Sequence, residues 1–190
     1  MTLLLMLLSL LCVAPAVSAD EAVSAVSSVS SVMTDPSAGN VFTLLSPAFK
    51  DGDSIPLQYT CRGADISPPL HIEHTPPGTK SLALTVHDPD GVTGTWVHWV
   101  VFNIAPHTVD LAEKDVLGTE ALNDFGNFYY GGPCPPDMKP HHYVFTLYAI
   151  NEVLVDIDEG ATMDTLLKTT RGKVLGKAVL TGIYQRMKWE

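Results

Sequence analysis

Polar side chains able to do chemistry gather at three places in the sequence. His87 to Gly91 (HDPDG) follows one apolar run, and His98 stands inside the next apolar run. The third place is the loop Tyr129 to Pro136 (YYGGPCPP), with His141 to Tyr143 (HHY) after it. Imidazole and carboxylate groups can bind an anion, move a proton or ligate a metal ion. We therefore consider the three places together as one candidate site.

Asp88 and His98 each have two interpretations. A lone histidine in an apolar strand is usually a core residue, and it needs a hydrogen-bond partner because burial disfavours its charged form. Asp88 can be that partner, since a carboxylate fixes the tautomer and raises the pKa of an imidazole. Asp88 can equally be a turn residue, because Asp-Pro-Asp-Gly is typical of turns. Alternation along a strand puts His141 and His142 on opposite faces, so only one of them can join Asp88 and His98.

The GGPCPP part of the loop predicts a stiff wall for a ligand. Its three prolines lack amide donors, and its two glycines allow a close approach of the backbone. Cys134 lies in this loop, and Cys61 is the other cysteine that remains if a signal peptide carries Cys12 away. An even pair in an oxidising compartment suggests one disulfide, and two buried thiols are the alternative.

The elements that must position these residues are mostly strands. Apolar and β-branched runs predict strands over residues 81–86, 96–103, 143–150 and 174–184. Gly176 and Gly182 predict bulges or close approaches within the last of them. Prolines and glycines, fourteen of each, fall mainly between the runs, as the turns of a compact β-sandwich require.

One short helix is expected before the last strand. Thr162 is a suitable N-cap, the helix runs through Leu167 to Thr170, and Gly172 closes it. Its buried stripe is predicted to consist of Met163, Leu166 and Leu167.

The N-terminus predicts export. Residues 1–19 read as a secretory signal peptide cleaved after Ala19, and their apolar run is shorter than the about 20 residues that span a membrane. An acyl anchor on Cys12 is the alternative, and the bulky Leu11 before it disfavours that. Residues 20–40 are rich in Ser, Val and Ala and predict a flexible leader, with a single domain over 41–190. We expect a periplasmic or secreted protein whose mature chain has no transmembrane segment.

Composition narrows the function classes. The 190 residues carry 11 Lys and Arg against 21 Asp and Glu, a net charge of −10, which leaves too few basic residues for a nucleic-acid-binding face. A hydrophobic content of 46% with 17% charged residues excludes disorder throughout. The sequence has no Gly-x-Ser-x-Gly elbow, P-loop or dinucleotide fingerprint, and no cofactor is expected.

Seven segments together resemble the phosphatidylethanolamine-binding protein family, which includes the Raf kinase inhibitor proteins, and they match its bacterial branch best. They follow the family's order between about Phe42 and Arg186: Cys61-Arg62-Gly63 with Ser67-Pro68-Pro69-Leu70, Pro77 to Leu84, Asp88-Pro89-Asp90, Trp96 to Val101, Asn123-Asp124-Phe125-Gly126, Gly131 to Pro136, and His141-His142-Tyr143.

The resemblance implies an all-β sandwich of two antiparallel sheets, with one or two short helices near the C-terminus and a small pocket for phosphate-type anions. It favours His141 over His142 as the site residue. The ligand-binding residues that it implies are Asp88, His98, Gly132, Pro133, Cys134, Pro135, His141 and Tyr143, with no metal ligand and no catalytic residue.

Three positions depart from the family's pattern. His142 stands where the family usually has Arg, and Arg62 stands where it usually has Asp. Tyr129 replaces a Gly, which predicts a narrower mouth of the pocket.

The function expected from all this is non-catalytic binding of a small anionic ligand, such as phosphate or a phosphoethanolamine-type headgroup, with an affinity that rises as the pH falls. One alternative is an inhibitor or regulator of a protein partner such as a protease or a kinase-like protein. Another is a hydrolase or metal-dependent enzyme that uses Asp88, His98 and His141. A homodimer is left open.

Overall fold

The computed structural model describes residues 40–158 and 160–188. The expected signal peptide and nearly all of the expected leader therefore lie outside the described residues. No helix in the described ranges has the length and apolar character needed to cross a membrane.

A five-stranded antiparallel sheet carries most of the fold. Its strand order is β6-β4-β3-β7-β8, and its bounds are β3 Ser81–Asp88, β4 Trp96–Ile104, β6 Thr119–Glu120, β7 His141–Ile150 and β8 Val174–Tyr184. The four strands expected from the sequence are confirmed. However, β3 continues two residues beyond its predicted end, and β7 begins two residues earlier than predicted. Asp88 and His141 are therefore strand residues, which fixes their side chains more firmly than a loop would.

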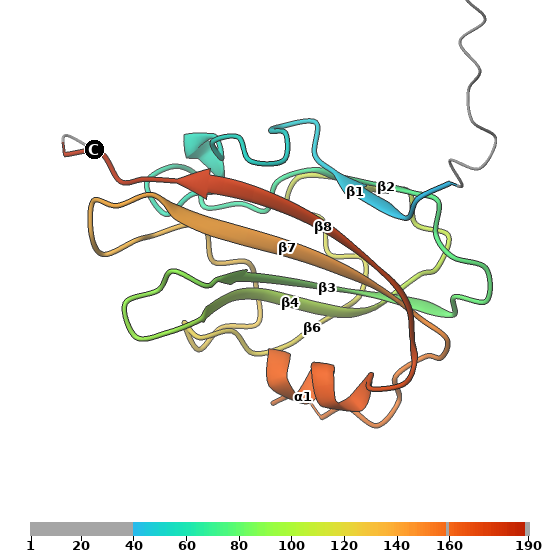
Figure 1. Cartoon of the computed structure of the whole chain (residues 1–190). Helices are drawn as coiled ribbons and strands as arrows, with labels where there is room; N and C mark the ends of the chain where they lie inside the picture. Colours follow the sequence, from blue (N-terminus) through green and yellow to red (C-terminus); the bar gives the residue numbers. More distant parts are fainter. Residues whose placement is uncertain (1–39, 159, 189–190) are drawn as a thin grey trace, which may run out of the picture. The chain divides into compact units, whose positions relative to one another are not determined.

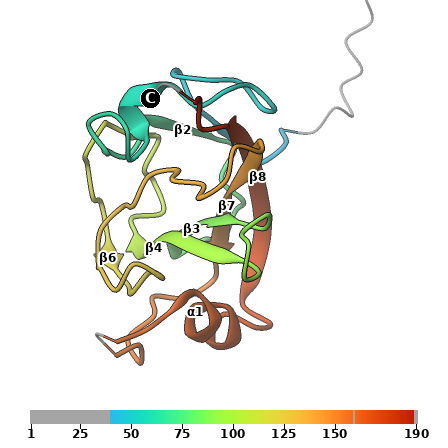
Figure 2. The same ribbon diagram turned by 90° about the vertical axis from the view of Figure 1, so that its left-hand side faces the viewer.

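A second antiparallel sheet has three strands, and the sequence analysis did not predict any of them individually. It consists of β1 Thr43–Leu45, β2 Leu70–Glu73 and β5 Asp110–Leu111, in the order β1-β2-β5. Strands this short do not show alternation in a sequence. Figures 1 and 2 show that β1 and β2 lie over one face of the large sheet and that the helix α1 (Met163–Thr169) lies over the other.

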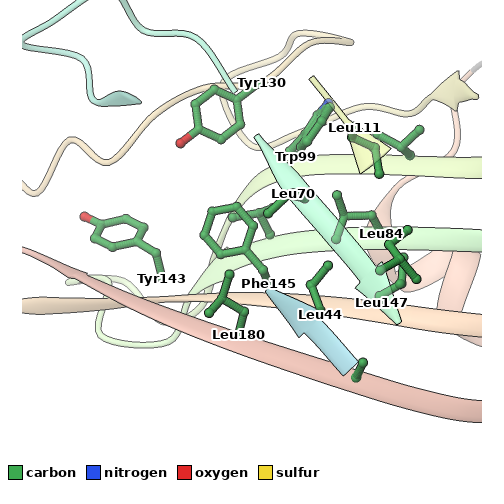
Figure 3. Packing of buried hydrophobic residues seen from close by; sticks show 14 of the residues in the cluster. Leu44, Leu70, Leu84, Trp99, Leu111, Tyr130, Tyr143, Phe145, Leu147 and Leu180 are labelled. Carbon is green, nitrogen blue, oxygen red and sulfur yellow. The ribbon is translucent and has the colours of Figure 1, made fainter. Parts of the chain in front are cut away.

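The large sheet is buried on both faces. Toward the small sheet, Leu84, Trp99 and Phe145 belong to one apolar cluster, and Figure 3 shows them with Leu44 and Leu70 of the small sheet. Ala83, Val100 and Tyr148 belong to a second cluster that includes Leu166 of α1. Burial on both faces explains why the sequence shows continuous apolar runs rather than strict alternation.

The helix begins and ends as the sequence indicates. The Thr162 side chain accepts a hydrogen bond from the Thr165 amide, and Gly172 has a φ of 77° just after the helix. Leu166 is 1% exposed and Met163 packs against the second cluster. The prediction for Leu167 was wrong, because Leu167 is 37% exposed. Consecutive helical residues point about 100° apart, so burial of Leu166 turns Leu167 outward.

Two glycines in β8 mark close approaches, as expected. A Cβ on Gly176 would lie 2.9 Å from Pro76, and a Cβ on Gly182 would lie 2.4 Å from the buried Ile55. The segment that carries Ile55 runs along the outer edge of β8. The Gly52 amide donates to the Thr181 carbonyl, and the Ile55 amide donates to the Ile183 carbonyl.

We expect Gly182→Ala to lower the free energy of unfolding by about 1–3 kcal/mol, because the added methyl group must displace Ile55 in a packed interface. Denaturant unfolding monitored by tryptophan fluorescence measures the change. Gly160→Ala is the matched control, since nothing lies within 4 Å of its Cβ, and it should stay within about 0.5 kcal/mol of the wild type. Equal effects of the two substitutions would contradict this account.

Candidate functional site

A pocket of about 310 Å³ opens at one end of the large sheet. Its polar lining comes from Asp88 at the end of β3 and His98 in β4, and its apolar lining includes Trp96, Phe125 and the Cys134–Pro136 stretch. The β3–β4 turn and the segment before β7 meet at this end of the sheet (Figure 1). Three segments that are distant in sequence thus form one hollow.

Asp88 is joined to His141 across the neighbouring strands. The His141 Nδ1 donates to Asp88 Oδ2 at 2.7 Å, and both side chains are at least 95% buried. The other oxygen of Asp88 accepts from the Asp90 amide at 2.8 Å, which shapes the turn after β3. Asp88 is thus both a turn residue and a histidine partner, but its partner is His141 and not His98. The pairing with His98 that the sequence suggested is wrong.

His141 is held between two carboxylates. Its Nε2 lies 3.1 Å from Asp137 Oδ1, opposite the bond to Asp88. Burial acts to lower the pKa of His141, but the hydrogen bonds and charges of Asp88 and Asp137 outweigh it, so the pKa is raised above its ordinary value. Both ring nitrogens donate in this arrangement, which requires the charged imidazolium.

His142 makes a second, exposed link between the same two strand ends. The backbone amide and the Nδ1 of His142 both donate to Asp90 Oδ2, at 2.9 and 2.7 Å. These hydrogen bonds, the one from the amide first, lower the pKa of Asp90. His142 therefore anchors the β3–β4 turn and does not enter the pocket.

His98 is buried and neutral near pH 7. Its Nδ1 donates to the Gly131 carbonyl at 2.6 Å, so the neutral ring carries its proton on Nδ1 and leaves Nε2 as an acceptor. Burial lowers the pKa of His98, and the backbone carbonyl of Gly131 opposes that shift only in part. The His98 ring contacts the edges of Phe125 and Tyr143 at centroid distances of 5.3 and 5.1 Å. An added proton would make Nε2 a donor.

Tyr143 lies behind the pocket rather than in its wall. Its side chain is fully buried, and its hydroxyl has no hydrogen-bond partner among the described residues. Burial first, and then the charge of Asp88, raise the pKa of Tyr143 well above its ordinary value. Tyr143 therefore supports His98 as a neutral aromatic ring.

The proline-rich loop is fastened to the chain around the short 3-10 helix η1 (Leu57–Tyr59). Cys61 and Cys134 form a disulfide with a Cα–Cα distance of 5.5 Å, and Cys61 also donates its amide to the Pro133 carbonyl at 3.2 Å. The Gly132 amide donates to Asp65 Oδ1 at 2.7 Å. A Cβ on Gly132 would lie 2.5 Å from Asp65, so only glycine fits there.

The structure divides the eight predicted ligand-binding residues into two sets. Asp88, His98, Cys134 and Pro135 line the pocket. Gly132, Pro133, His141 and Tyr143 do not, because they are buried behind that lining and support it. Tyr129 is 60% exposed and lies outside the lining, so it does not narrow the pocket as expected.

Sequence reasoning missed the apolar half of the pocket. Trp96 and Phe125 contact each other edge to face at 5.5 Å, and Val92, Thr93 and Pro136 complete this side. Trp96 was assigned to a buried strand, and its place as the first residue of that strand was the signal that it could face a ligand. Phe125 carried no local signal, because a loop aromatic residue is placed only by the tertiary fold.

Asp88, His98 and His141 do not converge as a metal site would require. His98 is bonded to a backbone carbonyl, and both nitrogens of His141 face carboxylates. In the part of the chain that the structure describes, no three His, Cys, Asp or Glu side chains are grouped so that they could hold a metal ion.

Comparison with known sequences gives one consistent family. The model of the phosphatidylethanolamine-binding protein family matches residues 45–185. A UPF0098 protein of Chlamydia pneumoniae is 43% identical over 149 residues, which cover 75% of this chain and 98% of that protein.

Solved structures agree with the sequence comparison. A phosphatidylethanolamine-binding protein homolog of Chlamydia trachomatis superposes with a TM-score of 0.75 at 40% identity, covering 78% of this chain and 99% of that one. YbcL of Escherichia coli, described as a member of the mammalian family, gives a TM-score of 0.72 at 30% identity, covering 77% and 99%.

The charged state of His141 is expected to depend on Asp88. In Asp88→Asn, the pKa of His141 should fall, because only Asp137 then opposes the effect of burial. The substitution should lower the free energy of unfolding by about 1.5–3 kcal/mol at pH 6, the usual contribution of a charged hydrogen bond. Because the folded pKa of His141 is raised, its stabilisation is complete below about pH 6.5 and is lost as the pH rises through the folded pKa.

Nuclear magnetic resonance titration of the imidazole nitrogens measures the pKa, and urea unfolding at several pH values measures the stability. Asp90→Asn is the control, because its carboxylate bonds the exposed His142 and should leave the pKa of His141 nearly unchanged. If Asp88→Asn leaves the titration of His141 where it is in the wild type, the assigned cause is wrong.

Proposed function

The chain belongs to the phosphatidylethanolamine-binding protein family, and from this premise we propose that it is a non-catalytic binding protein whose pocket takes a phosphate-type ligand, with a phosphoethanolamine headgroup as the best fit. The observation that carries the proposal is that one small pocket is lined by a carboxylate, Asp88, a histidine, His98, and two aromatic rings.

The size of the pocket suits a headgroup. Its volume of about 310 Å³ is near the lower limit for small-molecule sites, which run from about 300 to 1,000 Å³. The stiff Cys134–Pro136 wall is tied to Cys61 by a disulfide, which keeps this shape without a ligand and reduces the entropy lost on binding.

The charges of the pocket favour a zwitterion over a bare anion. Asp88 is the acidic residue in the lining, and no Lys or Arg accompanies it there. An ammonium group would be attracted to Asp88 and to the faces of Trp96 and Phe125. The phosphate of the same ligand would then lie toward His98, whose ring becomes a cationic donor when it gains a proton.

Export is part of the proposal. A disulfide between Cys61 and Cys134 favours an oxidising compartment, since such bonds are rare in the cytosol. Cleavage after Ala19 would deliver the domain to the periplasm or the medium, where headgroups and free phosphate esters are available as ligands.

We expect the affinity for an anion to rise as the pH falls below about 6.5, because protonation of His98 is then coupled to binding and its pKa lies below that ordinary value. Sulfate is the suitable probe, since its charge is constant over this range, whereas a phosphate monoester titrates near pH 6. His98→Gln should remove the pH dependence. Isothermal titration calorimetry from pH 5 to 8 measures both.

A second comparison separates the two ends of the ligand. Asp88→Asn should weaken binding of O-phosphoethanolamine several-fold more than binding of sulfate, because only the ammonium group of O-phosphoethanolamine is attracted to that carboxylate. Asp90→Asn, which changes a charge outside the pocket lining, is the control. The proposal fails if neither probe binds the folded protein at millimolar concentration, or if sulfate affinity is independent of both pH and His98.

A further inference from the structure

One of the two residues of the Cys61–Cys134 disulfide stands in the pocket wall. Cys134 is exposed and lines the pocket. Its partner Cys61 is less exposed, being half-buried, and lies outside the lining. Structural disulfides that serve stability alone are usually inaccessible, and exposed ones are the more easily exchanged. A thiol that enters the pocket therefore meets Cys134 as a lining residue, and it does not meet Cys61 there.

We propose that the Cys61–Cys134 disulfide is a thiol-exchange site, at which a small thiol that enters the pocket becomes attached to Cys134 as a mixed disulfide. The ligand class is a compact, unhindered thiol, because the pocket holds only about 310 Å³. The proposal concerns the wall of the pocket, and it does not depend on which ligand occupies the hollow.

The exchange is balanced without an external oxidant. The thiolate of the small molecule attacks Sγ of Cys134 and forms a new sulfur–sulfur bond. The bond to Cys61 breaks, and its electron pair leaves with Cys61 as a thiolate. One disulfide replaces another, so there is no net oxidation or reduction.

In the sequence, the leaving cysteine is followed by a cationic residue. Arg62 follows Cys61 directly and is exposed. A neighbouring guanidinium stabilises a thiolate, and a more stable thiolate leaves faster. The nearby carboxylate of Asp65 is already engaged by the Gly132 amide. A guanidinium of Arg62 that reaches the Cys61 sulfur would favour release of Cys61 rather than Cys134.

The fold does not rely on the disulfide alone to hold this loop. The hydroxyl of Tyr130 donates to the Tyr59 carbonyl at 2.9 Å, and the Gly131 amide donates to the His98 carbonyl at 3.0 Å. Bonds from Cys61 and Asp65 hold Pro133 and Gly132. Residues 130–133 therefore stay in place after exchange, and the change is confined to Cys134 and the two prolines after it, which have no amide hydrogen to donate.

The test is to incubate the folded wild-type protein with 2-mercaptoethanol, quench with acid and map the adducts by mass spectrometry. We expect the mixed disulfide on Cys134 and a free thiol on Cys61, with a rate that does not change in low concentrations of urea. An adduct mainly on Cys61 would overturn the proposal. So would a reaction that proceeds only at the rate of global unfolding.

Two matched variants provide an independent measurement. Cys61→Ser leaves Cys134 as a single thiol in the pocket, and Cys134→Ser leaves Cys61 alone. With 2-hydroxyethyl disulfide as the probe, Cys134 should react at least about ten-fold faster than Cys61. Equal rates in two folded variants would contradict the proposal, and the wild-type experiment decides the question if either variant does not fold.

Discussion

The pocket depends on the buried bond between Asp88 and His141. It joins the end of β3 to the start of β7, and both residues lie where the sheet meets the loops. The second oxygen of Asp88 shapes the β3–β4 turn, and Asp137 bonds the far side of His141. One carboxylate–imidazolium pair thus positions the turn, the strand ends and the approach to the proline-rich loop. A buried ion pair is costly to desolvate, and removal of either partner leaves the other without its hydrogen bond.

Much of the fold around the pocket could be predicted from the sequence, because it depends on strong local sequence patterns. The four long strands, the capped helix and the grouping of Asp88, His98 and His141 at one end of the sheet all followed from apolar runs and the residues at their ends. The hydrogen-bond partner of each of these side chains could not be predicted in this way. Asp88 could reach either histidine, and the choice was made by strand register, which pairs His87 with Val144 and so places the end of β3 beside the start of β7.

The remaining differences between the sequence analysis and the structure share a physical cause. His141 and Tyr143 were assigned to the pocket, yet tertiary packing buries them behind it, and Phe125 reaches the pocket from a loop. A side chain can face a cavity, or it can pack behind a residue that faces the cavity. The details of tertiary packing decide between these positions, and the residue type alone does not predict them. The strands β1, β2 and β5 are too short for periodicity, and their existence follows only from the apolar face that they cover.

The chain segment along β8 has a consequence for assembly. The outer edge of a sheet presents unpaired amides and carbonyls to which another copy can add. Here Gly52 and Ile55 occupy those groups at Thr181 and Ile183, and Ile55 fills the space that Gly182 leaves. This part of β8 is therefore closed to edge-to-edge aggregation. If two copies of the chain associate, they must do so without continuing the large sheet through residues 181–183.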